Sequence, residues 1–255
     1  MKIIAFVNQK GGVGKTTSTL NIGAGLSGVG RRVLLVDLDP QANLTYSLGV
    51  QGHTRTNNTY TLLKGTSTLA DTIVELNPVL HLLPSYLDLA AADTEFSSVP
   101  GREVLLKETL ESAYKYDYIL IDCPPSLGML TLNALVAARG IYIALQVEYL
   151  AIQGMAQLMR TIDIVKQRLN NEIEVAGIIA TRYDKRKNLN REVLEMIRNK
   201  FGNKVFNTEI RDNIALAEAP SHCKSIFEYQ PASHGAEDYQ KLCTEIIKRE
   251  ELNHD

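Results

Sequence analysis

The sequence predicts an α/β fold in which a single doubly wound, mainly parallel sheet carries helices on both faces. Short apolar runs rich in β-branched residues alternate with segments of helical periodicity along the whole chain. Several of these runs are apolar almost throughout, which is typical of strands covered on both sides. No internal repeat or low-complexity linker interrupts the alternation. We therefore expect residues 1–255 to form one domain.

Seven apolar runs are predicted strands, and the intervening segments supply the helices. The predicted strands cover residues 2–8, 32–39, 79–85, 116–125, 140–148, 174–182 and 204–210. The clearest helical segments cover residues 16–30, 127–139, 152–169 and 188–201. The polar segment 51–61 is the best candidate for a long loop.

Composition limits the classes of function. The chain is 45% hydrophobic and 22% charged, as in ordinary globular proteins, and its net charge of −2 gives no general attraction to nucleic acid. A role on nucleic acid therefore requires a local basic patch. The three cysteines are far apart and fit neither a disulfide framework nor a zinc site, which favours a cytoplasmic location. No run approaches the roughly 20 apolar residues that span a bilayer.

A glycine-rich loop follows the first predicted strand and precedes a predicted helix, in the stretch "AFVNQKGGVGKTT". Its glycines leave backbone N–H groups free to approach phosphate oxygens, and the helix directs its N-terminal dipole to the same place. Lys15 is placed to meet the β- and γ-phosphates and the Thr16 hydroxyl to bind Mg²⁺. Thr17 can donate to a further phosphate oxygen. These features predict a P-loop NTPase.

The loop departs from the usual spacing G-x-x-x-x-G-K-S/T, because Gln9 stands where the first glycine belongs. Instead "KGGVGKTT" carries an early lysine, Lys10, and so resembles the deviant phosphate loop of the ParA/MinD family. In that family this lysine contacts nucleotide held by the partner subunit of an ATP-sandwich homodimer, and the resemblance implies the same role for Lys10. An added cation would offset the repulsion between two closely packed triphosphates. The predicted nucleotide-binding residues of the loop are Lys10, Gly11, Gly12, Val13, Gly14, Lys15, Thr16 and Thr17.

Carboxylates end two of the predicted strands, where ligands gather in open α/β sheets. The stretch "DLDPQ" resembles the first switch of the family, which implies that Asp39 positions the attacking water and belongs to the outer shell of Mg²⁺. Asp37 is expected to anchor the loop. In "IDCPPSLG", Asp122 resembles the magnesium-linked acid of the second nucleotide motif. The predicted catalytic residues are Lys10, Lys15 and Asp39, and the predicted metal site comprises Thr16, Asp39 and Asp122.

The resemblance also extends to the C-terminal half. The segments "TRYD" and "EAPSH" correspond to the part of the family fold that lines adenine, which implies ATP as the nucleotide and Arg182 and Pro220 as base contacts. Arginine replaces the lysine of the T-K-x-D guanine motif. No obvious arginine finger is present, so we expect slow hydrolysis that a partner accelerates.

The segment 182–204 is the candidate DNA-binding surface. It holds eight basic and three acidic residues, a net +5, so the rest of the chain carries −7. Chromosome-partitioning members of the family hold DNA without sequence preference through arginines in this region, and Arg186 matches one such position. A second position, before "EAP", is occupied by Ala215, and Arg211 is the candidate substitute. The predicted DNA-binding residues are Arg186, Lys187 and Arg211.

The leading hypothesis is a partitioning ATPase that dimerises with ATP, binds DNA on the nucleoid and responds to a ParB-like partner with a basic tail. A MinD-like membrane switch is disfavoured, since residues 237–255 hold six acidic and three basic residues and an anionic bilayer would repel them. A metabolic ATP-dependent enzyme of the same superfamily is the third hypothesis. An iron–sulfur role for Cys123 is disfavoured because no second suitable cysteine is present. The cargo, whether chromosome, plasmid or protein cluster, stays open.

Overall fold

The computed structural model describes residues 1–51, 56–149 and 151–252. In these residues seven strands form one sheet in the order β3-β4-β2-β5-β1-β6-β7. The strands are β1 (Lys2–Phe6), β2 (Val33–Asp37), β3 (Val74–Asn77), β4 (Leu80–Leu83), β5 (Tyr118–Asp122), β6 (Gly140–Gln146) and β7 (Glu174–Thr181). Only the edge strand β3 is antiparallel to its neighbour. The predicted mainly parallel, doubly wound sheet is therefore confirmed.

Helices connect the strands and cover both faces of the sheet. The longer ones are α1 (Lys15–Gly28), α7 (Met129–Ala137), α8 (Ala151–Arg168), α9 (Asn188–Phe201) and α12 (His234–Leu252). The shorter α-helices are α2 (Asn43–Ser47), α3 (Thr59–Leu63), α4 (Leu69–Thr72), α5 (Ala92–Glu95), α6 (Leu105–Leu110), α10 (Ile214–Glu218) and α11 (Ile226–Tyr229). Short 3₁₀ helices cover Leu87–Ala91, Phe96–Ser98, Gly202–Lys204 and Ala219–His222.

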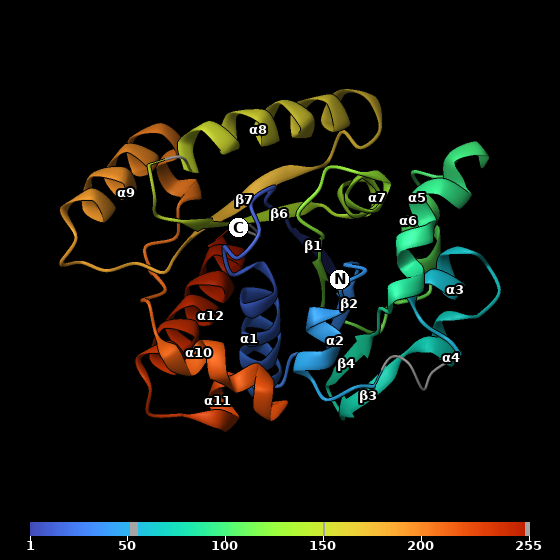
Figure 1. The fold of residues 1–255 in the computed structure, drawn as a ribbon, viewed down its shortest axis with the longest axis horizontal. Helices are drawn as coiled ribbons and strands as arrows, with labels where there is room; N and C mark the ends of the chain where they lie inside the picture. The colour runs from blue at the N-terminus through green and yellow to red at the C-terminus, as the bar shows by residue number, and fades with distance from the viewer. Residues whose placement is uncertain (52–55, 150, 253–255) are drawn as a thin grey trace.

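Two apolar cores lie on the two faces of the sheet, as expected for strands that are apolar throughout. On one face, α1 and α12 pack together, with Leu26 and Leu242 fully buried beside Phe6 of β1. On the other face, residues of α6 to α9 form the second core, including Leu135 and Val193. Figure 1 shows α8 on one side of β6 and β7 and α1 with α12 on the other. The sheet is thereby held between two helical layers.

The prediction of a strand over residues 204–210 is wrong. An isolated bridge joins Val205 to Ile178 of β7, and the Phe206 and Ile210 N–H groups donate to the Ile178 and Ala180 carbonyls. Between them, the backbone N–H groups of Asn207 and Thr208 donate to the Glu245 carboxylate of α12, at 2.8 and 3.0 Å. The segment therefore runs beside β7 without forming a ladder. The seventh strand is the short β3, which the sequence reasoning missed.

The predicted loop 51–61 ends earlier than expected. The Asn58 side chain accepts hydrogen bonds from the Tyr60 and Thr61 backbone and starts α3, completing a capping box with Thr61. Residues 52–55 of this prediction lie outside the described residues. None of the helices in the described part of the chain combines the length and hydropathy that a bilayer span needs.

Candidate nucleotide site

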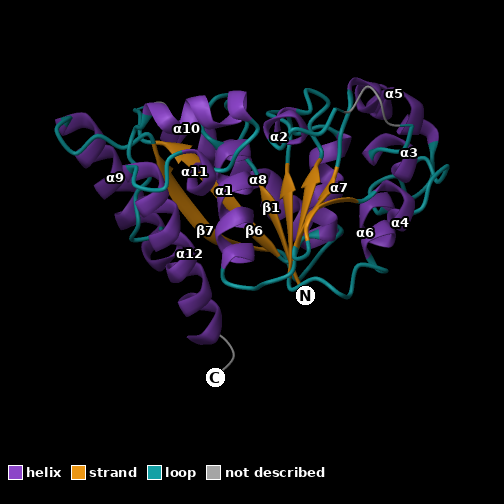
Figure 2. Ribbon diagram, turned by 90° about the horizontal axis from the view of Figure 1, so that it is seen from below, coloured by secondary structure: helices purple, strands orange, loops and turns teal. Residues whose placement is uncertain are grey.

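A cavity of about 580 Å³ opens at the carboxyl edge of the sheet. Figure 2 shows the strand arrows pointing toward this edge, where α2 and α10 lie. The cavity gathers residues from distant parts of the chain, as expected at the carboxyl ends of parallel strands. The predicted site residues that line it are Gly11, Gly12, Gly14, Lys15, Thr16, Thr17, Asp39, Arg182, Arg211 and Pro220.

The phosphate loop has the backbone that its glycines predict. Gly12 and Gly14 have φ angles of +72° and +87°, in the left-handed region that side chains disfavour. Gly14 precedes α1 and offers no side-chain cap to its first turn. The N–H groups at the start of this 14-residue helix therefore remain available to an anion in the cavity.

Two polar side chains fasten this loop to the sheet, and sequence reasoning missed both. The Thr181 hydroxyl, at the end of β7, donates to the Val13 carbonyl at 2.7 Å. The Asn8 amide donates to the Ala144 carbonyl of β6 at 2.7 Å, and its oxygen accepts the Lys10 backbone N–H at 3.0 Å. Val13 and Thr181 are almost fully buried. The loop is thus held in place by β6 and β7 before any nucleotide binds.

Replacing Thr181 with valine is expected to lower the free energy of unfolding by about 1–3 kcal/mol, because the buried Val13 carbonyl loses its donor. ATP affinity should fall with it, since the loop loses one of its anchors. Urea denaturation and a nucleotide titration would measure both effects. Thr181→Ser keeps the hydroxyl and is the control. A valine variant as stable as the serine variant would contradict this role.

A hydroxyl and a carboxylate meet at the base of the loop. The Thr16 Oγ1 donates to Asp122 Oδ2 at 2.6 Å. Asp122 is fully buried, and its Oδ1 has no hydrogen-bond partner among the described residues. Burial raises the pKa of Asp122, and the nearby Asp37 carboxylate adds to the effect. An unpartnered buried carboxylate oxygen beside a hydroxyl suits a divalent cation.

These two residues fit Mg²⁺ as it binds with nucleotides. Mg²⁺ usually takes one or two protein ligands and completes its shell with water and phosphate oxygens. Within the described residues, no cluster of three or more His, Cys, Asp or Glu side chains is arranged to hold a metal on its own. Thr16 and Asp122 would hold the ion, and the bound phosphates would complete the site.

Lys15 lies at the floor of the cavity and is 7% exposed. Burial lowers the pKa of its ammonium group, while the nearby Asp122 and Asp39 carboxyl groups oppose this shift. The carboxylates of Asp122 and Asp39 thus favour the charged lysine in a desolvated position. That arrangement suits a cation meant to meet phosphate oxygens.

The two aspartates of the first switch have different environments. Asp37 is fully buried and accepts hydrogen bonds from the Thr45 N–H and hydroxyl and from the Asp39 N–H. Burial raises the pKa of Asp37 to about 7. Asp39 lines the cavity, and its carboxylate accepts only the Gln41 N–H among the hydrogen bonds found in the described residues, at 2.9 Å. Asp37 therefore anchors the turn, as the sequence predicts, and Asp39 faces the nucleotide site.

The opposite wall of the cavity comes from the end of β7 and from α10. Arg182 has a φ of +51° and pairs with Asp212, Nε to Oδ1 at 3.6 Å. Pro220 lines the same cavity, and the base contacts of Arg182 and Pro220 stay predictions. Asp212, Asn213 and Leu216 also line the cavity and were missed, because nothing in the run 204–210 marked the residues after it as part of a site.

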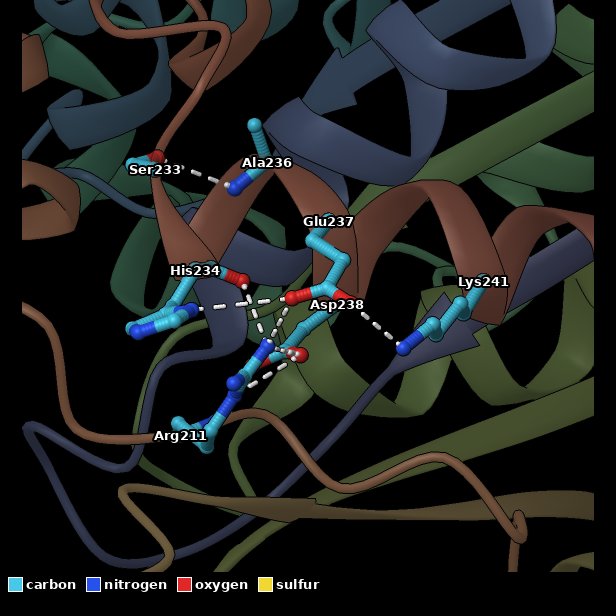
Figure 3. A network of polar contacts seen from close by, with 7 residues as sticks. All are labelled: Arg211, Ser233, His234, Ala236, Glu237, Asp238 and Lys241. Atoms are coloured by element: carbon cyan, nitrogen blue, oxygen red, sulfur yellow. Dashed lines mark hydrogen bonds and ion pairs between the residues drawn. The ribbon is translucent and has the colours of Figure 1, made fainter.

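Arg211 is held by carboxylates of α12 (Figure 3). Its guanidinium contacts Asp238 through Nε and Nη2, and Nη2 also pairs with Glu237 at 2.5 Å. Its backbone N–H donates to the same Asp238. The hydrogen bonds that Arg211 donates to the Asp238 carboxylate raise the pKa of Arg211. Arg211 therefore joins the cavity wall to α12, and its contact with DNA stays a prediction.

The side chains of Lys10 and Lys15 line different cavities. Its side chain is half exposed and lines a neighbouring cavity of about 260 Å³, beside Asn8, Gln146 and the start of α8. The ammonium group pairs with Glu148, just beyond β6, at 2.5 Å. The structure thus separates the two lysines of the loop.

The predicted DNA-binding loop follows β7 at the same edge of the sheet. Arg186 is 84% exposed and forms a bidentate pair with Asp184, with both distances 2.9 Å. Lys187, also exposed, precedes α9. The buried Asn190 of α9 accepts the Asp184 N–H at 3.0 Å and donates to the Val147 carbonyl at 2.6 Å. Asn190 therefore attaches this loop to the end of β6.

Known proteins are similar to this chain in sequence and in fold. A family model described as AAA domain matches residues 1–175. The chain is 45% identical to the sporulation initiation inhibitor protein Soj of Bacillus subtilis, covering 96% of this chain and 98% of that protein. It is 40% identical to the chromosome partitioning protein ParA of Caulobacter vibrioides, covering 98% and 95%. The crystal structure of cobyrinic acid a,c-diamide synthase from Mycobacterium smegmatis, with bound ADP and magnesium, is 36% identical with a TM-score of 0.87, covering 98% and 95%.

Proposed function

The chain belongs to the Soj/ParA family of chromosome-partitioning ATPases, and from this premise we propose that it is an ATP-driven switch for DNA partitioning. The whole chain, residues 1–255, acts as one ATPase domain. With ATP bound it forms a homodimer that binds DNA non-specifically on the nucleoid in the cytoplasm. Hydrolysis of ATP, slow until a ParB-like partner accelerates it, releases the DNA.

The cofactors are ATP and Mg²⁺, and the cavity supplies groups for both. The loop N–H groups and Lys15 bind the triphosphate, and Thr16 and Asp122 hold the cation, which neutralises phosphate charge when bound. Asp39 orients the attacking water. Arg182 and Arg211 line the cavity, yet both are paired with carboxylates. These pairs compete with any contact of the two arginines with the transition state, which supports slow intrinsic turnover.

The position of Lys10 carries the dimer proposal. Lys10 belongs to the phosphate loop but lies outside the cavity that the loop glycines, Lys15 and the two threonines line. Its charge can therefore serve a second nucleotide once its side chain leaves Glu148. Large apolar side chains are also exposed at this edge, in α2, in α10 and in the segments that follow β4 and β6. They are Tyr46 (44%), Leu87 (62%), Tyr149 (65%) and Ile214 (77%). A second copy of the chain facing this edge would cover them.

A DNA mobility assay with and without ATP tests the proposal directly. We expect the protein to retard random-sequence DNA with Mg-ATP and to lose most of this binding with ADP. Affinity should fall steeply with salt, because phosphate contacts dominate such binding. Binding that is indifferent to nucleotide would refute the switch. Parallel sedimentation with anionic vesicles would test the membrane alternative.

Replacing Asp184 with asparagine is expected to tighten DNA binding by roughly 2- to 10-fold at about 0.1 M salt, since it frees Arg186 for a phosphate. The salt dependence should become steeper in the same variant. Fluorescence anisotropy with labelled DNA across a salt series would measure both. Glu192→Gln removes the same charge from α9 without touching the Arg186 pair and is the matched control. Equal affinities for the two variants would contradict a phosphate contact by Arg186.

A second candidate is ATP-dependent synthesis on a small substrate. One observation favours it: the diamide synthase structure is 36% identical over nearly the whole chain. The partitioning relatives, at 40–45% identity, favour the first reading. ATP turnover with DNA and with a panel of small carboxylic acids separates the two. Turnover that responds to an acid and not to DNA would support the synthase.

A further inference from the structure

The Lys10–Glu148 pair lies between two fixed pieces of backbone. The Lys10 N–H is bound by Asn8, which is itself bound to β6. Glu148 lies in the turn between β6 and α8, where its N–H donates to the Gln146 carbonyl at 2.8 Å and its carbonyl accepts the Ala151 N–H at 3.0 Å. The two side chains therefore meet because the fold places them together. The pair can therefore separate by side-chain movement alone, with both backbone segments in place.

In this pair, Glu148 binds the Lys10 ammonium group, which is the cation on which the proposed dimer depends. Lys10 cannot keep its 2.5 Å contact with Glu148 and also give its full charge to a nucleotide of a second subunit. Once Lys10 has moved, the Glu148 carboxylate would remain beside an incoming triphosphate and repel it. We propose that Glu148 is a positioning residue that holds Lys10 within its own subunit and so opposes nucleotide-driven dimerisation. The inference rests on the function proposed above and concerns the regulation of the same site.

The exposure of the pair sets the size of the effect. The side chains of Lys10 and Glu148 are 50% and 46% exposed, so solvent screens their attraction. Exposed ion pairs of this kind change an equilibrium by roughly 1.4- to 5-fold. Because a homodimer breaks two such pairs, the combined effect on its dissociation constant is roughly 2- to 30-fold. Glu148 is thus a restraint that a bound triphosphate can overcome.

The test compares dimer dissociation constants by analytical ultracentrifugation with Mg²⁺ and the non-hydrolysable analogue AMPPNP. Glu148→Gln keeps the shape of the side chain and removes its charge, and we expect its dimer to be roughly 2- to 30-fold tighter than the wild type. Glu172→Gln breaks the pair with Arg139, 3.1 Å long, at the opposite end of β6 and serves as the control. An unchanged or weaker dimer in Glu148→Gln would overturn the proposal.

A second measurement on the nucleotide-free protein keeps this inference separate from the proposed function. Limited acetylation followed by mass spectrometry reports the reactivity of the Lys10 amino group. We expect this reactivity to rise in Glu148→Gln, where the carboxylate partner is gone, and not in Glu172→Gln. A tight variant dimer with a weak or absent wild-type dimer supports the restraint. If no form dimerises, the proposed function fails, and the acetylation rates decide whether Glu148 holds Lys10. Equal rates in all forms overturn it.

Discussion

Replacing Lys10 with alanine is expected to abolish nucleotide-dependent dimerisation and DNA binding while ATP still binds. Lys10 lies outside the cavity that Lys15, Thr16 and the loop glycines line, so each protomer keeps its own phosphate contacts. The dimer loses one cation at each of its two nucleotides. Close charge pairs across interfaces couple strongly, so we expect dimerisation to weaken by at least roughly 100-fold.

Three measurements on the same preparation check this result: nucleotide titration, ultracentrifugation with AMPPNP, and DNA mobility. Lys64→Ala is the matched control, because Lys64 is also half exposed and pairs with a glutamate, Glu95, at 3.1 Å. That control should dimerise like the wild type. A Lys10→Ala protein that still dimerises and retains DNA with ATP would refute the sandwich dimer, and with it the proposed switch.

Replacing Asp39 with alanine is expected to give the opposite behaviour, a dimer that forms but does not turn over. Asp39 is 7% exposed and faces the cavity, while Asp37 anchors the turn that carries it. Without a carboxylate to orient the water, hydrolysis should fall by roughly 10²- to 10⁴-fold. DNA release should slow in proportion, because it follows hydrolysis in the proposed cycle.

Phosphate release and DNA dissociation after dilution would measure this effect. Asp163→Ala, at an exposed position of α8, removes an equal charge away from the cavity and is the control. If Asp39→Ala hydrolyses ATP at the wild-type rate, the water is oriented by another group. If it stays monomeric with Mg-ATP, the dimer itself is in doubt.

The parts of the site that could be predicted from the sequence are those coded by contiguous residues. The glycine spacing of the loop, followed by Lys15 and Thr16, fixes a backbone conformation and a helix start within ten residues. Asp39 and Asp122 follow apolar strands, and strands of a parallel sheet bring their ends together. The structure places Lys15, Thr16 and Asp39 on one cavity, and the buried Asp122 accepts a hydrogen bond from Thr16.

The parts that were missed depend on contacts between distant segments. Thr181 supports the loop through Val13, 168 residues earlier, and no local pattern marks it. The run 204–210 has a strand-like composition, yet Glu245 accepts the backbone N–H groups of Asn207 and Thr208 in its middle and interrupts the pairing with β7. The pairing of Arg211 could not be predicted either, because its carboxylate partners lie on α12, far along the chain. Counting basic residues cannot reveal such pairing.

Asn190 fixes the position of the basic loop relative to the sheet. One amide group binds both Asp184, in that loop, and Val147, next to the glutamate that pairs with Lys10. The Asn190 side chain therefore connects the loop to the segment after β6. A chimaera that received the basic loop of a relative, but had no asparagine at position 190, would carry the basic charges. It would lack the contact that joins the loop to the segment beside Glu148.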